Sequence, residues 1–262
     1  MLQIKKNRIN QDIVVVVTIG LALMTGLGLI VFSALNNLSF VAVLGVSIAF
    51  WSLLLLFFTP TKKVFLALLR ASASASGSNI ERSLMEFNLV EKGVYLPPQN
   101  LHNFESSLVF VPKKLQATLP TADETGDKLL SEKKNGLFFT PPGLALSKMF
   151  EHELGMSFRK IPLSQMEITI KKLVSNLKFA EGAHVQIQDS TINLEVTGSI
   201  FNTLCSETKD DQPRTHAQVG CILASAFACA FAKASDKPIT IQKDILNLDD
   251  KTMIIEYLMD NV

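Results

Sequence analysis

The chain has 262 residues, a formal net charge of +1 and 48% hydrophobic residues. Residues 1–70 carry six basic residues against one acidic residue, so they sum to +5 and residues 71–262 sum to −4. Binding of nucleic acid requires a basic face, and a mildly acidic main part with scattered basic residues offers none. The composition therefore excludes nucleic acid as the partner.

Two long apolar segments follow the first dozen residues. Ile13–Leu35 and Leu38–Phe58 carry no charged residue, and each covers the roughly 20 residues that a helix needs to cross a hydrocarbon core. Only Asn36 and Asn37 lie between them. The pattern predicts that residues 1–60 form a transmembrane helical hairpin with a tight turn, embedded in the lipid bilayer.

Basic residues flank this hairpin at both outer ends and are absent from its turn. Positive charges stay on the cytoplasmic side of membrane helices, so we expect a multi-pass protein of the cell membrane with both termini in the cytoplasm. The alternative is a cleaved signal peptide, because Lys5, Lys6 and Arg8 resemble its basic leading region. The apolar run is longer than such a peptide needs, and a second span follows at once, which favours the hairpin.

Small residues recur at helical spacing in both segments. They are Gly20, Ala22, Gly26, Gly28, Ala42, Gly45 and Ala49. Small residues let helix backbones approach closely, which favours either packing within the hairpin or a homo-oligomer with another copy. Neither segment contains an ionisable residue, so the sequence gives no indication of a pore or a pump.

Residues 61–77 connect the hairpin to the rest of the chain. Lys62–Arg70 is a short apolar segment with basic ends, which either lies along the inner membrane surface or ends the second helix. Ala71–Gly77 is a run of alanine and serine, typical of a flexible linker. Residues 78–262 then form the expected cytoplasmic domain.

This domain opens with Ser78-Asn79-Ile80-Glu81, a capping-box pattern that predicts the start of a helix. Three short apolar segments bounded by proline or glycine predict strands at 93–98, 108–112 and 136–140. The polar stretch 121–135 predicts a surface loop.

The second half of the domain continues the mixture of helices and strands. Helices are predicted over 144–154 and 163–179, and hairpins over 184–188 with 191–197 and over 239–243 with 253–258. The helix over 163–179 is expected to turn Ile168 and Leu173 toward the core. Val219–Ala232 is apolar on all sides but too short to span a bilayer, so it predicts a central buried helix. This order predicts an α+β domain with an antiparallel sheet.

The three cysteines, Cys205, Cys221 and Cys229, are odd in number and form no C-x-x-C pattern. We expect a cytoplasmic domain to keep them reduced, without a disulfide. Cys221 and His216 near the start of a buried helix offer a nucleophile and a base, whereas Cys221 and Cys229 could equally serve as small core residues. No acid or oxyanion element stands at a recognisable spacing, so no catalytic residue is assigned.

Glu151-His152-Glu153 resembles part of a zinc-protease motif, but Met156 stands where a second histidine is required. We expect these side chains to form a solvated helix face. No glycine-rich phosphate loop is present in the sequence. The sequence therefore predicts neither a metal site nor a cofactor.

An apolar pocket is the candidate binding site. Aromatic residues on the predicted strands and small residues on the alanine-rich helix either line such a pocket or fill the core. The candidate ligand-binding residues are Tyr95, Phe110, Phe138, Phe139, Gly220, Cys221, Ala224 and Ala228.

Several motifs carry a resemblance to known families. VYLPP at Val94–Pro98, GLFFTPPGLAL at Gly136–Leu146 and LEVTGS at Leu194–Ser199, together with the two-span anchor, resemble an uncharacterised family of archaeal membrane proteins without assigned activity. Val185–Leu258 also looks like the small-molecule-binding domain related to 4-vinyl reductases, through its hairpin, its helix starting at Gly220 and its closing hairpin. Those domains usually carry further cysteines in the closing hairpin, and this sequence has none there.

The main hypothesis is a two-span membrane protein whose cytoplasmic domain binds a protein partner or a small apolar ligand without chemistry of its own. Its motivation is the anchor, the linker and the missing catalytic constellation. The alternatives are a membrane-tethered enzyme that uses Cys221 with His216, and a purely structural membrane organiser that assembles through its spans.

Overall fold

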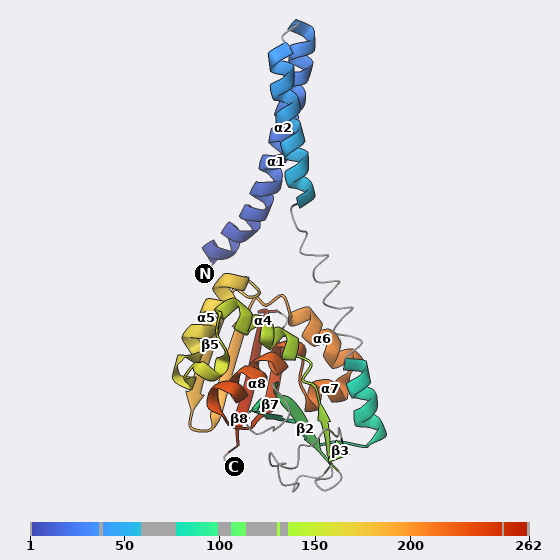
Figure 1. Ribbon diagram of the computed structural model, residues 1–262, viewed down its shortest axis with the longest axis vertical. Coiled ribbons are helices and arrows are strands. Elements are labelled where there is room, and N and C mark those ends of the chain that lie inside the picture. The colour runs from blue at the N-terminus through green and yellow to red at the C-terminus, as the bar shows by residue number, and fades with distance from the viewer. Residues whose placement is uncertain are drawn as a thin grey trace. The chain divides into compact units, whose positions relative to one another are not determined.

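A computed structural model describes residues 2–36, 39–58, 77–98, 106–113, 130–131, 136–247 and 249–260. The chain forms two compact units, Met1–Leu68 and Leu69–Val262 (Figure 1). The predicted juxtamembrane segment and almost all of the predicted linker lie outside the described residues.

The first unit consists of two helices, α1 (Leu2–Asn36) and α2 (Ser39–Phe58), as the two apolar segments predicted. By length and composition, Thr18–Asn36 could cross a membrane, and Ser39–Leu55 is apolar but shorter. The first helix starts well before the apolar segment, since nothing in the polar lead-in stops a helix. Large apolar side chains are exposed on both helices: Leu21, Met24, Val31, Phe40, Val43 and Trp51.

The two helices approach each other through their small residues. A Cβ atom on Gly26 would lie 2.8 Å from the backbone nitrogen of Ala49, and one on Gly45 would lie 2.8 Å from the carbonyl oxygen of Gly26. By contrast, a Cβ on Gly28 would meet nothing within 4 Å. The small faces of both segments are therefore used for packing within this unit.

The second unit is an α+β domain built on an eight-stranded sheet, in the order β3-β4-β2-β1-β7-β8-β6-β5. All neighbouring strands are antiparallel, as predicted. The strands are β1 (Val94–Leu96), β2 (Leu108–Pro112), β3 (Leu130–Ser131), β4 (Gly136–Phe139), β5 (Gly182–Gln188), β6 (Thr191–Thr197), β7 (Ile239–Asn247) and β8 (Thr252–Met259).

The predicted strands are confirmed, and among the described residues one strand was missed. The strand β3 lies in the stretch 121–135 that was predicted as a loop, where Leu130 pairs with Leu137 and Ser131 pairs with Gly136. With only two residues it has no alternation that a sequence pattern could reveal. The two halves of the sheet, β1–β4 and β5–β8, join where β1 pairs with β7.

Helices cover one face of this sheet (Figure 1). Residues 77–86 form the first helix of the domain. It is followed by α4 (Leu144–Leu154), the short helices η3 (Phe158–Lys160) and η4 (Leu163–Gln165), α5 (Met166–Leu177), α6 (Asn202–Asp211), α7 (Pro213–Gln218) and α8 (Ile222–Ser235). The helix predicted over 144–154 is confirmed, whereas α6 was not predicted.

The helix predicted over 163–179 is shorter, and one of its core residues was placed wrongly. Ile168 is 72% exposed, whereas Met166, Ile170 and Leu173 are fully buried. Residues four and seven positions after Met166 share its face of a helix, and Ile168 lies on the opposite one. The sequence obscured the buried face because Ile168 is as apolar as the residues that do lie on it.

The helix α8 is the central buried helix that the sequence predicted. Pro213–Ser235 also has the length and composition of a membrane span, but 83% of its most apolar window is buried inside the domain. Two aromatic side chains of α8 pack against rings from other elements of the core. The ring centroids of Phe227 and Phe150 lie 5.4 Å apart, and those of Phe231 and Tyr257 lie 5.2 Å apart. The helix is therefore part of the domain core.

Candidate functional site

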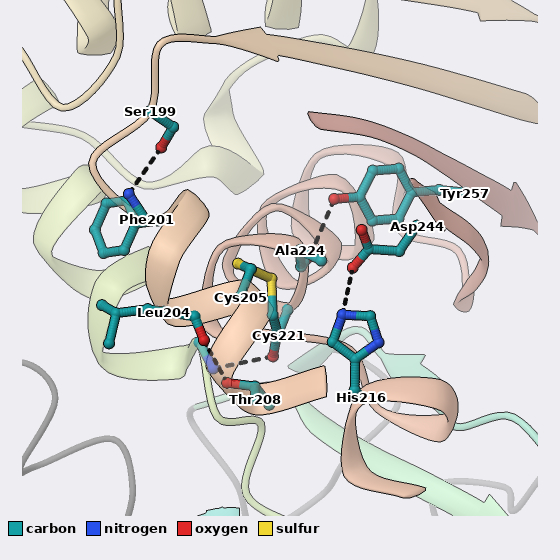
Figure 2. Close-up of a disulfide and its surroundings, with 12 residues drawn as sticks. Ser199, Phe201, Leu204, Cys205, Thr208, His216, Cys221, Ala224, Asp244 and Tyr257 are labelled. Atoms are coloured by element: carbon teal, nitrogen blue, oxygen red, sulfur yellow. Dashed lines mark hydrogen bonds and ion pairs between the residues drawn. A yellow bond between two sulfur atoms is a disulfide. The ribbon is translucent and has the colours of Figure 1, made fainter. Parts of the chain in front are cut away.

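A disulfide joins Cys205 on α6 to Cys221 at the N-cap of α8 (Figure 2). The expectation of three reduced cysteines was therefore wrong. The two residues are 16 positions apart, and α7 returns the chain so that their Cα atoms lie 5.2 Å apart. That separation suits a disulfide, but it depends on a tertiary contact that spacing alone could not predict. Cys229 is free and buried.

His216 on α7 faces Asp244 on β7, with 3.4 Å between Nε2 and Oδ2 (Figure 2). Their side chains are 12% and 7% exposed. Burial lowers the pKa of His216 and raises the pKa of Asp244, because loss of water disfavours both charged forms, and each charge offsets part of the shift on the other. Both carboxylate oxygens of Asp244 lack a hydrogen bond among the described residues.

The predicted pair of Cys221 with His216 is not formed in this arrangement. The sulfur of Cys221 is bonded to Cys205, and the imidazole of His216 faces a carboxylate. The hydroxyl of Tyr257, close to Asp244, donates to the carbonyl of Ala224 at 3.0 Å. The thiol that the catalytic alternative needs as a nucleophile is therefore consumed by the disulfide.

The first helix of the domain holds α7 in place. The carboxylate of Glu81 accepts hydrogen bonds from the backbone N–H groups of Arg214 and Thr215, at 3.2 and 2.7 Å, and from the hydroxyl of Thr215 at 2.8 Å. Glu81 thus satisfies N–H groups at the N-terminus of α7, which have no partner within that helix. Ser78 lies inside the helix of residues 77–86 and not at its N-cap, as the sequence pattern suggested.

A pocket of about 370 Å³ lies beside these elements. One side is formed around the start of α4, by Thr140, Pro141, Pro142, Leu144, Ala145 and Lys148. The other side is formed by Gly77, Thr208, Gln212, Thr215, Gly220 and Ile222. The lining is mainly apolar, with hydroxyl and amide groups on its second side.

Lys148 supplies the charge of this pocket. It is exposed and has no carboxylate partner among the described residues, and none of the described lining residues is acidic. The helices α4 and α8 both begin at the pocket, and neither of their N-cap residues, Gly143 and Cys221, provides a side-chain cap. The N-termini of helices attract negative charge, so both of these helix starts favour an anionic group at the pocket.

Comparison with known protein families gives one match. A family model described as a domain of unknown function, DUF7982, matches residues 1–258. The chain belongs to the DUF7982 family. No curated protein and no solved structure matches this DUF7982 chain, so its function has to be argued from the geometry of the site.

The structure of the DUF7982 chain divides the predicted aromatic residues between two faces of the sheet. Tyr95 and Phe139 pack in the main core with α8, and the Tyr95 hydroxyl donates to the carbonyl of Val219. Phe110 and Phe138 belong to a second cluster, with ring centroids 5.0 Å apart. The register that pairs Tyr95 with Val109 sends Phe110 to the opposite face.

The small residues of α8 are also divided. Ala224 and Ala228 are fully buried in the core, and Gly220 lines the pocket. A Cβ atom on Gly220, whose φ is +82°, would lie 2.6 Å from the Ile241 side chain. Of the eight candidate ligand-binding residues, Gly220 is the one that the described pocket includes.

Several residues of the site were missed by the analysis of the sequence. Lys148, Thr208 and Gln212 come from helices whose other faces pack elsewhere, and no periodic signal distinguishes them. The capping role of Glu81 bridges 134 positions to Thr215. In the described part of the chain, no three histidine, cysteine or acidic residues are grouped to hold a metal ion.

Proposed function

We propose that this protein is a membrane-anchored, non-catalytic binding module. Its domain holds a small, largely apolar ligand with an anionic group in the pocket between α4, α6, α7 and α8. The observation that carries the proposal is the pocket itself, with its apolar lining and its single basic side chain, Lys148, among the described residues.

The pocket has the properties of a small-molecule site. Its volume of about 370 Å³ lies at the lower end of the range of ligand pockets, roughly 300–1,000 Å³. Leu144, Ala145 and Ile222 offer apolar contact, and the hydroxyls of Thr208 and Thr215 lie on the other wall. A mostly apolar lining with a few polar groups is typical of sites that orient one ligand.

The charge of the pocket favours an anionic group on that ligand. Lys148 provides an ammonium group, and the starts of α4 and α8 add the positive ends of two helices. No described lining residue opposes this charge with a carboxylate. A carboxylate or phosphate at Lys148, followed by an apolar body, satisfies both features.

Placement at the membrane rests on the first unit. Its two apolar helices, with large apolar side chains exposed, suit a hairpin in the lipid bilayer. The basic residues at its outer ends favour a cytoplasmic domain. The resemblance of Val185–Leu258 to small-molecule-binding domains related to 4-vinyl reductases bears on ligand binding by the domain and not on its placement.

Binding of two matched probes tests the proposal. Full-length protein in lipid nanodiscs is titrated with 2-naphthoate and with its neutral analogue 2-naphthamide, and the thermal unfolding midpoint is followed. Both share one ring system, and the carboxylate adds a charge-assisted interaction with Lys148. We expect naphthoate to bind about tenfold more tightly, which corresponds to about 1.4 kcal/mol.

Two variants and one control complete this experiment. Lys148→Met should remove most of the difference in affinity between the two probes, and Ala145→Trp should abolish binding of both because the indole fills the pocket. The control Met149→Trp, on the same helix but outside the described lining, should bind as the unmodified protein does. If Ala145→Trp leaves both affinities unchanged, the probes bind elsewhere and the pocket is not the site.

A further inference from the structure

Gly77, the first residue of the α+β domain that the structure describes, also lines the pocket. Residues 59–76 connect it to the end of α2, so Gly77 lies where the chain enters the described part of the domain from the first unit. The pocket therefore includes in its lining the residue through which the domain is attached.

Gln212 connects this attachment point to the pocket. Its side chain lines the pocket, and the residue is 8% exposed. A Cβ atom on Gly77 would overlap Gln212 Oε1, so the amide packs directly against the glycine backbone. The Nε2 group of the same amide donates to the Ser78 hydroxyl at 3.4 Å. One side chain thus contacts both the pocket and the first turn of the helix of residues 77–86.

Thr215 makes a second contact between the pocket and this turn. Its hydroxyl oxygen lies 3.5 Å from the carbonyl oxygen of Gly77, and the hydroxyl donates to Glu81 at 2.8 Å. Thr215 and Gln212 lie on the same wall of the pocket, and Lys148 on α4 belongs to the opposite wall. A ligand that fills the space between the walls therefore contacts α4 on one side and the first turn of the helix on the other.

The remainder of this helix is held independently of the pocket. Ile80 and Leu84 are buried in the core, and Glu81 accepts hydrogen bonds from the start of α7. Undocking can therefore be confined to residues 77–79. It would remove Gly77 from the lining, so a ligand that contacts this wall binds the docked form more tightly and shifts the equilibrium toward it.

We propose that Gln212 couples the pocket to the attachment point of the domain, so that a bound ligand fixes the first turn of the helix of residues 77–86. This inference rests on the proposed function, since it concerns the same ligand. Coupling between two sites is reciprocal, so a change at Gly77 must alter the affinity of the pocket by the same interaction. Occupancy of the pocket is thereby transmitted to the part of the chain that leads to the anchor.

Hydrogen exchange of the ligand-free protein tests the contact itself. In an α-helix the N–H groups of residues 81–83 donate to the carbonyls of residues 77–79, so their exchange reports undocking of the first turn. Full-length protein in nanodiscs is compared with Gln212→Ala and with the matched control Thr208→Val, which changes the same wall at a hydroxyl that donates to Leu204 within α6. We expect exchange over residues 81–83 to be about fivefold faster in Gln212→Ala and unchanged in Thr208→Val. Equal exchange in the two variants overturns the inference.

The same measurement with saturating 2-naphthoate tests the effect of a ligand. Exchange over residues 81–83 should become about tenfold slower in the unmodified protein. The helix α5, Met166–Leu177, contributes none of the described lining residues and should keep its rate. At saturation Thr208→Val should show the full slowing, and Gln212→Ala should show little of it. A bound probe that leaves exchange over residues 81–83 unchanged refutes the coupling.

The affinity of a variant at the attachment point tests the reciprocal effect. In Gly77→Ala the added methyl group forces the amide of Gln212 to move, and the dissociation constant of 2-naphthoate should rise about fivefold. Met85→Ala, an exposed position on the same helix outside the described lining, should bind as the unmodified protein does. An unchanged affinity in Gly77→Ala contradicts the inference. If the unmodified protein binds neither probe, the proposed ligand class fails, and the ligand-free comparison of Gln212→Ala with Thr208→Val still decides on the contact.

Discussion

Gly143 lies where the start of α4 meets the first turns of α8. Its N–H donates to the hydroxyl of Ser225 at 3.0 Å. A Cβ atom at this position would overlap the backbone nitrogen of Ala226 and the carbonyl oxygen of Ile222. The residue has φ −89° and ψ 3°, which any amino acid adopts, so glycine is required here for space and not for conformation.

The variant Gly143→Ala should therefore destabilise the domain by about 3 kcal/mol or more, because backbone atoms cannot move aside as a side chain does. The measurement is denaturant unfolding of the full-length protein, followed through the tertiary signal of the domain. Gly182→Ala is the matched control, since its Cβ would meet the Thr197 hydroxyl at 3.0 Å, and it should change stability by about 0.5 kcal/mol at most. Equal effects of both variants would contradict this account.

At the scale of single residues, the sequence predicts whether a side chain is buried better than it predicts which face of the sheet the side chain occupies. The apolar character of Tyr95, Phe110 and Phe138 places them on buried strands, and all three are buried. The face of the sheet that each one occupies depends on the register between strands, and a shift of one residue exchanges the two faces. No feature of a single strand encodes that register. The division of these residues between two clusters could therefore not be predicted from the sequence.

At the scale of elements, an ion pair connects α4 to the central helix. The ammonium of Lys233 donates to Glu151 Oε2 at 2.7 Å, and Oε1 accepts from the Ser157 hydroxyl at 2.6 Å and from the Phe158 N–H at 2.9 Å. The side chains of Lys233 and Glu151 are 7% and 16% exposed. The expectation that Glu151 lies on a solvated face was wrong, because Lys233 ends an otherwise apolar helix and needs a counter-ion.

Removal of one partner of this pair should be costly. Lys233→Met leaves the Glu151 carboxylate buried without its cation, and we expect a loss of about 3 kcal/mol in the free energy of unfolding at pH 7. The combination with Glu151→Leu should recover most of that loss, since an apolar pair of similar size removes the uncompensated charge. Chemical denaturation of the two variants at one pH provides the comparison, and a double variant as unstable as the single one would argue against the ion pair.

The pH dependence of stability offers a second test of the same carboxyl group. Burial raises the pKa of Glu151, but hydrogen bonds from Lys233, Ser157 and Phe158 outweigh it, so the pKa lies below its ordinary value of 4.5. A depressed folded-state pKa contributes stability above the unfolded value and loses it as the pH falls through the folded one. Unfolding curves between about pH 5 and pH 3 should show this loss, and Glu151→Gln should flatten the dependence.

Element boundaries with local causes were predictable, and contacts between distant segments were not. The strand β1 and the helix α4 are bounded by glycine or proline at both ends, and β2 ends at Pro112. The backbone properties of these residues act within a few positions. The partners of Glu151 and Cys221 are instead set by how helices pack, through contacts that have no periodic signal. These contacts built the candidate site, so the pattern of the sequence could predict the fold but not which side chains the fold brings together there.

At the scale of the whole molecule, two features favour different compartments for the domain. The basic residues at the outer ends of the hairpin favour the cytoplasm, whereas a buried disulfide is more common in oxidising compartments.

A cysteine added after Val262 decides between these compartments. In intact cells it should resist a membrane-impermeant maleimide and react fully once the membrane is permeabilised. The native cysteines, all buried, serve as the background in a chain without the added residue. Full labelling in intact cells would place the domain outside, and the disulfide would then be a permanent structural bond.

The attachment of α7 to Glu81 has a practical consequence for work on the isolated domain. The helix of residues 77–86 precedes the first strand and could be taken as unnecessary for the domain. Its residue Glu81, however, accepts hydrogen bonds from the backbone of Arg214 and Thr215, and Gly77 lines the pocket. A version without the first unit must retain Gly77 and the rest of this helix. Trimming to β1 would remove the carboxylate that accepts hydrogen bonds from the start of α7. That helix lies more than a hundred residues further along the chain than the cut.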